Sequence, residues 1–564
     1  MQGTEFILST LPPHLFMFVG GLVDPFLPAV ANGPVTPVVA ANEAGAVYAA
    51  DGYARATRTY GAVLMIGGPG AFNAVGGVGA ASADGVPLLV ITGETATNLQ
   101  GRGAFQDASA VGVSDLPVFE SMTGFSHHVP SPPALVHYLR QAHNTMLGHR
   151  RPVHLAVPKD VQQAEVGHPV WHPAPIGPPR MLDQDAFDRF ALEALSKATN
   201  IAILAGGGTL ASDASAELLA AAEALQIPVA TTFRAKGALS EDHPLSLGMF
   251  GYAGHPPAEE CLTSPDLEAL LVLGSSLNQR DTLDWNRRLQ PKLGLASVNL
   301  DAATIGRDFP VSHPVVGDVR TALRRLISPD APWAEALRHS AAARRSWADG
   351  YLSRPRFLNP EHLTSDETPI HPARIVGELR KALPRDAALL IDSGAHRAFA
   401  GHYFPIYQPN RLFSATGLGP MGWAIAASIG VATALPGTKV AVITGDGCML
   451  QNGLELVTAA RHKLDILYVV CNNSALGNVY LRAKKVGPGP ASLTELPTLD
   501  WTAFANSLGV AGITVEEPSG LAPAFARFLE QGGPLLVDVR CDREAATPVG
   551  PWTEALSHPD IYAE

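Results

Sequence analysis

The chain has 564 residues, of which 46% are hydrophobic and 16% charged, and its formal net charge is −12 at pH 7. This length predicts three or four domains of ordinary size, and a globular composition with so little charge favours buried subunit contacts. The acidic balance argues against a nucleic-acid-binding protein, because neutralising phosphates requires a basic face. None of the four cysteines belongs to a CxxC pair, and the first ten residues lack a basic region. We therefore expect a reduced, cytoplasmic protein without a signal peptide.

Three blocks of the chain alternate short apolar runs with amphipathic, alanine-rich stretches, which is typical of α/β domains with parallel sheets flanked by helices. The first block is predicted to span residues 1–168. A helix is predicted over Glu43–Thr57, because its alanines and Tyr53 fall on one face. The proline-rich run Pro169–Pro179 predicts a linker. The strands predicted in this block are Leu15–Val19, Ala62–Ile66, Pro87–Thr92 and Val153–Val157.

The second block is predicted to span residues 183–330. The runs IAILAGGG, IPVATTF and ALLVLGSSL predict strands, SAELLAAAEAL predicts a helix, and LASVNLDAA is a fifth element. The following segment, up to about Pro369, is charged and interrupted by prolines, so we predict a second linker there.

The third block is predicted to span residues 368–545, with strands in AALLIDSG, KVAVITGDG, ILYVVCNN and PLLVDVRC, and an irregular tail from Arg543. The run GLGPMGWAIAASIGVATAL is long and apolar enough to raise the question of a membrane span. Its many small residues favour a close-packed buried helix, so no membrane partner is expected.

Two polar motifs follow neighbouring strands of the third block. Gly445-Asp446-Gly447 ends one strand, and Asn472-Asn473 ends the next after a helix predicted over about Asn452–His462. In open α/β sheets such strand ends meet at the ligand-binding edge. The oxygens of Asp446 and Asn473 suit Mg²⁺ or Ca²⁺ rather than a soft metal, and the glycines let backbone amides approach phosphate. The pair therefore predicts a site for a diphosphate and Mg²⁺, although either motif alone would mean little.

With its spacing of about two dozen residues, the GDG and NN pair resembles the thiamine diphosphate motif. The whole chain resembles the superfamily of acetolactate synthase, pyruvate decarboxylase and benzaldehyde lyase, closest in pattern to acetolactate synthase-like proteins. The resemblance implies a pyrimidine-binding domain, a central domain and a diphosphate- and Mg²⁺-binding domain, in the order of the three blocks. It implies thiamine diphosphate and Mg²⁺ as cofactors.

The first block carries an independent part of the resemblance. The segment ANEAGAVYAADGYARAT resembles the one that holds the family's catalytic glutamate, which would be Glu43. The alternative for Glu43 is an acid that merely stabilises a helix N-terminus. A GPG loop implies cofactor contacts at Pro69 and Asn73, and GRGAFQD implies a catalytic Gln106.

The third block supplies the remaining residues by resemblance. Met421 would be the apolar residue under the bend of the cofactor, although a methionine in such a run could also be core filler. The alternative for His396 is a structural hydrogen-bonding role. The cofactor-binding set implied here is Gly394, Ala395, His396, Gly419, Met421, Gly445, Asp446, Gly447, Cys448 and Asn473, and the metal ligands are Asp446, Asn473 and Ala475.

By resemblance, Glu43 would contact a nitrogen of the pyrimidine ring and relay a proton, for which it should be buried against an apolar wall. Met421 would force the bend that brings the reacting groups together. The family builds each site between the first domain of one subunit and the third domain of another, which implies a homodimer or homotetramer.

Several positions depart from one relative or another. The glycine pair Gly20-Gly21, expected to contact the cofactor, matches synthases, and NLQGRGAF lacks the histidines of decarboxylases. His127-His128 is interpreted as structural. Asn42 and Ile66-Gly67 break the usual synthase pattern, and SGAHRAF lacks the tryptophan that selects a larger acceptor.

The resemblance therefore implies an acetolactate synthase-like enzyme that makes or breaks a carbon–carbon bond in a 2-oxo acid or 2-hydroxy ketone, through an enamine intermediate. A 2-hydroxyacyl-CoA lyase and a benzaldehyde lyase-type enzyme are alternatives. A non-catalytic relative is disfavoured, because Glu43, Asp446 and Asn473 are all present.

The second block leaves a flavin-binding oxidoreductase as an alternative of another class. AGGG is a fragment of a dinucleotide turn, and Arg280-Asp281 loosely resembles a flavin-contacting segment, so FAD is possible but not expected. Lys484 and Lys485 could meet an anionic substrate, although a solvated basic loop is the simpler interpretation.

Overall fold

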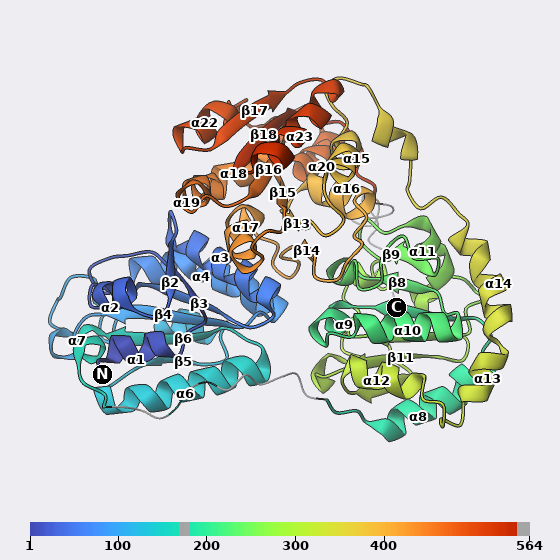
Figure 1. Ribbon diagram of the computed structural model, residues 1–564, viewed down its shortest axis with the longest axis horizontal. Coiled ribbons are helices and arrows are strands. Elements are labelled where there is room, and N and C mark those ends of the chain that lie inside the picture. Colours follow the sequence, from blue (N-terminus) through green and yellow to red (C-terminus); the bar gives the residue numbers. More distant parts are fainter. Residues whose placement is uncertain (168–170, 172, 174–179, 550–564) are drawn as a thin grey trace.

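The computed structural model describes residues 1–549 except 168–170, 172 and 174–179. It contains three six-stranded parallel sheets, each flanked by helices, which confirms the predicted fold class. The sheets form three lobes at the corners of a triangle, coloured blue to cyan, green, and orange to red (Figure 1). Two predicted features, most of the linker Pro169–Pro179 and the end of the tail, lie outside the described residues.

The first sheet has the strand order β2-β1-β3-β4-β6-β5. Helix α3 spans Glu43–Thr57 as predicted, and the side chain of Asn42 caps it by accepting a hydrogen bond from the amide of Gly45. The strands are β1 His14–Met17, β2 Thr36–Val39, β3 Gly61–Ile66, β4 Leu88–Glu94, β5 Ser126–His128 and β6 Val153–Pro158. The other helices are α1 Gly3–Ser9, α2 Phe26–Asn32, α4 Pro69–Asp84, α5 Leu116–Glu120, α6 Pro132–His149 and α7 Lys159–Gln163.

The second sheet has the order β12-β11-β10-β7-β8-β9. Its strands are β7 Ile201–Ala205, β8 Val229–Thr231, β9 Ser246–Met249, β10 Ala269–Leu273, β11 Gly294–Asn299 and β12 His313–Val316. The helices are α8 Gln184–Glu193, α9 Gly207–Ala211, α10 Ser215–Leu225, α11 Pro256–Leu262 and α12 Val319–Leu326.

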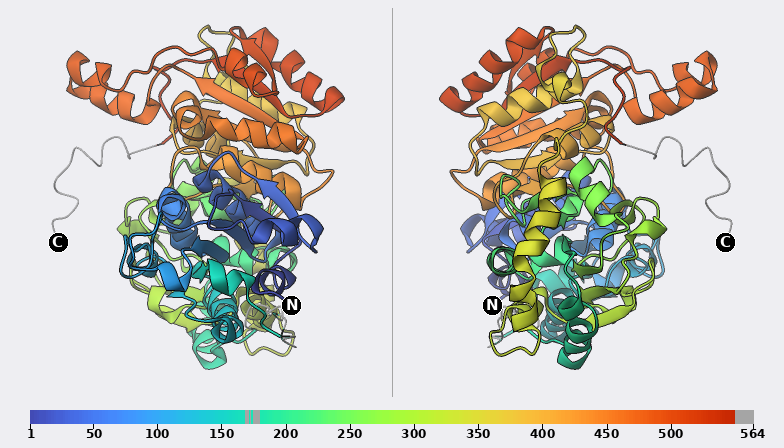
Figure 2. Two further views of the ribbon diagram at one scale, coloured as in Figure 1. Left: turned by 90° about the vertical axis from the view of Figure 1, so that its left-hand side faces the viewer. Right: turned by 90° about the vertical axis from the view of Figure 1, so that its right-hand side faces the viewer.

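The second predicted linker is wrong over much of its length, because helices α13 Ala334–His339 and α14 Ala341–Leu352 occupy it. They run along the outer side of the central lobe toward the third lobe (Figures 1 and 2). The fully buried Arg344 of α14 donates to the backbone carbonyls of Thr199, at 2.9 Å, and Leu225. Tertiary contacts to the central domain thus order a segment whose charges suggested a linker.

The third sheet has the order β14-β13-β15-β16-β18-β17. Its strands are β13 Ala388–Ile391, β14 Leu412–Phe413, β15 Val440–Gly445, β16 Ile466–Asn472, β17 Ala511–Val515 and β18 Leu535–Arg540. The helices are α15 Pro372–Ala382, α16 Ala395–Tyr403, α17 Trp423–Ala434, α18 Asp446–Asn452, α19 Leu456–Arg461, α20 Gly477–Val486, α21 Pro488–Ser492, α22 Trp501–Ser507 and α23 Leu521–Gln531.

The helix predicted over Asn452–His462 differs from the one observed. The chain turns into α18 at Asp446, directly after β15, and reaches α19 through a 3-10 turn at Gly453–Glu455. Glycines at 445 and 447 do not mark a loop here, because the helix starts at the strand end itself. Asp446 therefore lies in the first helical turn, where a negative charge is favoured.

Helices α3 and α17 join the first and third lobes through backbone contact (Figure 1). A β-carbon at Gly52 would overlap the carbonyl oxygen of Ala427, and one at Gly430 would overlap that of Ala49. The small residues of α17 thus serve close packing against α3, as predicted for a buried helix. No helix in the described part of the chain is long and apolar enough to cross a membrane.

Candidate active site

A cavity of about 280 Å³ opens at the carboxyl ends of β13, β15 and β16. Asp446 at the end of β15 and Asn473 after β16 both line it, as expected for parallel strands that end at one edge. The predicted residues in its wall are Gly394, Ala395, His396, Met421, Gly445, Asp446, Gly447, Cys448, Asn473 and Ala475. Gly419 is absent from this wall, although a β-carbon there would lie 3.6 Å from Oγ of the lining residue Ser393.

The carboxyl group of Asp446 has one oxygen available to a ligand. Its Oδ1 accepts the amide of Gly447 at 2.8 Å, whereas its buried Oδ2 has no hydrogen-bond partner among the described residues. Burial raises the pKa of Asp446 to about 6, against the lowering effect of neighbouring backbone amides. A buried carboxylate oxygen without a partner fits a divalent cation, which would restore the ionised form.

Glycines shape the wall around Asp446. A β-carbon at Gly447 would lie 2.9 Å from Cε of Met421, and one at Gly394 would overlap the imidazole of His396. The close approach of bare backbone and the run of amides at the start of α18 form a cradle suited to phosphate. The residues present therefore fit a diphosphate held through a cation.

His396 lies inside the same cavity as a neutral side chain. Burial and the adjacent Arg397 lower its pKa to about 3, and its Nε2 has no partner among the described residues. A neutral imidazole at this point can donate or accept a hydrogen bond without adding charge. Beside it, the thiol of Cys448 donates to the carbonyl of Ser393 at 3.1 Å.

The wall also includes residues that were not predicted as site residues, among them Arg482, Arg543, Cys471 and Cys541. Arg482 comes from α20, Arg543 follows β18, and Cys471 and Cys541 lie at the ends of β16 and β18. Cys471, Cys541 and Arg543 could have been predicted from their position at the carboxyl ends of strands, whereas Arg482 on α20 carries no such signal in the sequence. The cavity also includes Arg280, which sequence reasoning had connected with a flavin. Lys484 lies outside this wall and pairs with Glu544 at the surface, as the solvated alternative predicts.

Glu43 is buried in the first domain, with 6% of its surface exposed. Its Oε2 accepts a hydrogen bond from the side-chain amide of Asn73 at 3.0 Å, and a β-carbon at Gly70 would lie 3.0 Å from its Oε1. The GPG loop thus closes directly over the carboxyl group, and the structure brings Glu43 and Asn73 together.

A second cavity, of about 560 Å³, has both Pro69 of the GPG loop and Gln106 in its wall. Gln106 adopts a left-handed backbone, with φ of 58°. Gly20 and Gly21 follow β1, and a β-carbon at Gly20 would lie 2.8 Å from Cγ2 of Ile66 at the end of β3. These residues belong to the carboxyl edge of the first sheet.

Within one chain, the two groups of predicted site residues line separate cavities. Among the described residues, the wall of the Asp446 cavity comes from the second and third domains, and that of the Gln106 cavity from the first. Both edges expose apolar side chains: Phe105 is 85% and Val113 72% exposed in the first domain, and Leu418 is 65% exposed in the third. His127 and His128 lie apart, on edge strand β5, where His128 Nδ1 contacts Glu94 at 2.6 Å.

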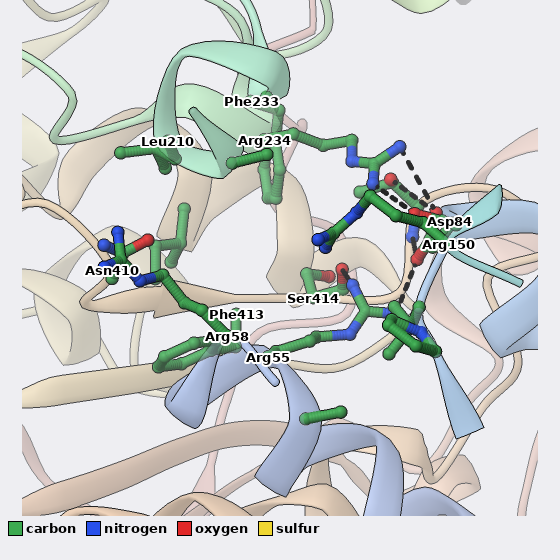
Figure 3. A pocket seen from close by; sticks show the side chains of 18 residues that line it. Arg55, Arg58, Asp84, Arg150, Leu210, Phe233, Arg234, Asn410, Phe413 and Ser414 are labelled. Carbon is green, nitrogen blue, oxygen red and sulfur yellow. Dashed lines mark hydrogen bonds and ion pairs between the residues drawn. The ribbon is translucent and has the colours of Figure 1, made fainter. Parts of the chain in front are cut away.

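A smaller cavity of about 140 Å³ lies where the three domains meet (Figure 3). Asp84 lies at its edge, bound by Arg55 at 2.8 Å and by Arg234, whose Nη2 donates to the Asp84 carbonyl at 2.7 Å. Burial opposes ionisation of Asp84, but these arginines lower its pKa to about 2. Gly207 of the glycine turn after β7 also lines this cavity.

Comparison with known proteins gives one consistent result. Family models of the thiamine pyrophosphate enzymes match the chain in order: the N-terminal TPP binding domain at residues 1–113, the central domain at 189–326 and the C-terminal TPP binding domain at 392–539. A probable acetolactate synthase large subunit of Methanococcus aeolicus is 30% identical over 98% of this chain and 94% of its own length. The acetolactate synthase large subunit of Corynebacterium glutamicum is 31% identical over 95% and 86%, respectively.

Proposed function

The chain belongs to the thiamine pyrophosphate enzyme family, and we propose that it is a carboligase of the acetolactate synthase type, acting on 2-oxo acids. The observation that carries the proposal is the Asp446 cavity, with its unpartnered carboxylate oxygen between glycines and its neutral His396. Relatives named acetolactate synthase align over nearly the whole chain and favour this reading over the lyases and the flavin oxidoreductase.

The third domain would hold the diphosphate end of the cofactor. Asp446, the side-chain oxygen of Asn473 and the carbonyl of Ala475 would bind Mg²⁺, because all three are hard oxygen ligands. The side-chain oxygen of Asn473 already accepts the amide of Ala475 at 3.1 Å, which fixes its orientation. Thiamine diphosphate, when bound, supplies an electron sink next to a carbonyl carbon.

The first domain would supply proton transfer. Glu43 would accept and donate a proton at Oε1 or Oε2 in a site from which most water is excluded, and Asn73 fixes one of these oxygens. Met421, from the third domain, presents its Cε to the cavity beside Gly447 and would orient the bound cofactor by contact. Gln106, on the wall of the first-domain cavity, would position the reacting carbonyl group.

We further propose that each active site forms between two chains, in a homodimer or homotetramer. The separation of the Gln106 and Asp446 cavities in one chain supports this, as do the exposed apolar side chains at both edges. A two-fold interface would place the first domain of each chain against the third domain of the other, and so form two equivalent sites. The four cysteines are free thiols, which suits the cytoplasm as the place of action.

FAD is left out of the proposed cofactors. The cavity beside the glycine turn measures about 140 Å³, half the volume of the Asp446 cavity. A β-carbon at Gly208 would lie 2.7 Å from Cα of Gly274, so the ends of β7 and β10 are already packed together. The salt bridges of Asp84 occupy the polar edge of this cavity.

The test combines binding and product analysis. Purified protein with thiamine diphosphate and Mg²⁺ should convert pyruvate to acetolactate and CO₂. The Asp446→Asn variant should lose Mg²⁺-dependent cofactor binding by about 100-fold. Asp465→Asn is the matched control, because Asp465 pairs with Lys439 at the opposite end of β16 and should leave binding unchanged. Tight cofactor binding without acetolactate would reject the synthase assignment.

A further inference from the structure

Glu455, a residue of the third domain, holds the beginning of the helix that carries Glu43. Its carboxylate accepts the amide of Ala41 at 3.1 Å on Oε1 and 3.2 Å on Oε2, and the amide of Asn42 at 3.3 Å on Oε1. Glu455 is completely buried, in the 3-10 turn that follows α18. The two amides immediately before α3 are therefore fixed by a charged side chain from another domain.

The surroundings of Glu455 are built around this contact. The hydroxyl of Thr458 donates to Oε2 at 2.8 Å and holds the carboxylate from its own side. On the opposite side, Gly45 leaves the space that the carboxylate fills, since a β-carbon there would overlap Oε1 of Glu455. The side chain of Asn42 then caps the helix through the amide of Gly45.

Glu43 lies between two constraints as a result. Asn73 and Gly70 contact its carboxyl group, while Glu455 fixes the backbone two residues before it. Glu43 is the first residue of α3, so a shift of this backbone moves its side chain directly. We propose that Glu455 is a positioning residue for Glu43, setting the register at which the proton-relay carboxyl enters the active site. This inference rests on the proposed role of Glu43.

A general stabilising role would not require this geometry. Hydrogen bonds to a carboxylate stabilise the amides that donate them, but the start of α3 could be fixed by its Asn42 cap alone. Glu455 adds a restraint at the start of the helix, because it binds the backbone amides of Ala41 and Asn42 from the third domain. A displacement of about 1 Å at a catalytic group can cost roughly 100-fold in rate, so this restraint matters for chemistry more than for folding.

The experiment compares Glu455→Gln and Glu455→Ala with wild type through two measurements. The first is amide hydrogen exchange of the peptide around residues 39–46 in cofactor-free protein. The second is the rate of deuterium exchange at C2 of bound thiamine diphosphate, measured by acid quench and NMR, together with the cofactor Kd. Glu530→Gln, at an exposed position of α23, is the control, and Thr458→Val is a milder variant that keeps the carboxylate.

We expect both Glu455 variants to exchange the amides of Ala41 and Asn42 faster and to slow C2 exchange by about tenfold or more, with cofactor Kd within about threefold of wild type. Thr458→Val should move both measurements in the same direction by less. Unchanged amide exchange, or loosened amides with an unchanged C2 rate, would overturn the proposal. If Glu43→Gln leaves the C2 rate unchanged, the proposed function fails instead, and the two failures are thus distinguished.

Discussion

The indole N–H of Trp423 donates to the carboxylate of Asp51 at 2.7 Å, joining α17 of the third domain to α3 of the first. Asp51 is completely buried and also binds Arg55 through both of its oxygens, at 2.6 and 3.1 Å. The guanidinium of Arg55 lies 4.9 Å from the centre of the Trp423 ring. Trp423 thus donates a hydrogen bond to the buried carboxylate of Asp51 and packs against Arg55, the cation that pairs with it.

Replacing Trp423 by phenylalanine should lower the free energy of unfolding by about 1–3 kcal/mol, because one acceptor position of a buried carboxylate loses its donor while the apolar contact remains. Urea denaturation followed by circular dichroism measures the loss. Trp285→Phe, at a half-exposed position of the central domain, should cost less than about 0.5 kcal/mol. Equal losses in both variants would contradict the importance of the Asp51 contact.

Two helical glycines should respond to alanine with opposite signs. Gly430→Ala places a methyl group against the carbonyl of Ala49, so we expect a loss of about 3 kcal/mol or more and poor recovery of folded protein. Gly350→Ala, in exposed α14 with open space around it, should gain about 0.5–1 kcal/mol from helix propensity. Thermal melts of both variants provide the comparison, and a neutral Gly430→Ala would disprove the close crossing of α3 and α17.

Acid should destabilise the protein through buried neutral histidines. Burial lowers the pKa of His154 from 6.5 to about 3, and the ring contacts Thr92 at 2.8 Å and Ser126 at 3.0 Å. Between these pH values the unfolded chain binds a proton that the folded chain does not. The stability linked to His154 is therefore complete above pH 6.5 and falls as pH drops, by up to about 1.4 kcal/mol per unit.

The variant His154→Gln should consequently show a shallower loss of stability between about pH 6 and pH 4, measured by urea titrations at several pH values. The exposed His127, on the neighbouring edge strand β5, provides the control variant His127→Gln, which should keep the wild-type slope. An unaltered slope in His154→Gln would assign the acid sensitivity to other groups.

Mixing two inactive variants should restore activity if each site is shared between chains. Glu43→Gln and Asp446→Asn subunits, refolded or exchanged together, would form heterodimers with one intact site and one doubly altered site. Random mixing predicts recovery of about a quarter of wild-type activity. Steady-state acetolactate assays after subunit exchange measure it, with each variant alone as the baseline. No recovery despite verified exchange would place Glu43 and Asp446 in the same chain's site.

The central strands of all three sheets were predictable, whereas the edge strands were not. Strands such as β3 and β16 are buried along their length and appear as continuous apolar runs. Edge strands β2, β12 and β17 are short or half-exposed, and two of them contain proline, so no apolar run marks them. Only their pairing with a neighbour makes them strands.

The candidate site divides along similar lines. Asp446 and Asn473 were predictable because parallel strands deliver their carboxyl ends to one edge. Arg482 on α20 and the contact between Glu455 and Ala41 depend on how separate elements pack, and no local pattern in the chain encodes them. The start of α18 at Asp446 was misjudged because glycines in a motif resemble a loop when no tertiary contact is considered.

The crossing of α3 and α17 has a practical consequence for anyone who wishes to redirect this enzyme. Substitutions at Gly52 and Gly430 should not be tolerated, because the backbones of the two helices touch there and leave no room for a β-carbon. Substitutions are better introduced at positions such as Phe105 and Leu418, whose side chains are largely exposed in a single chain. The contact between α3 and α17 should therefore be kept unchanged, and new specificity should be sought at the exposed positions.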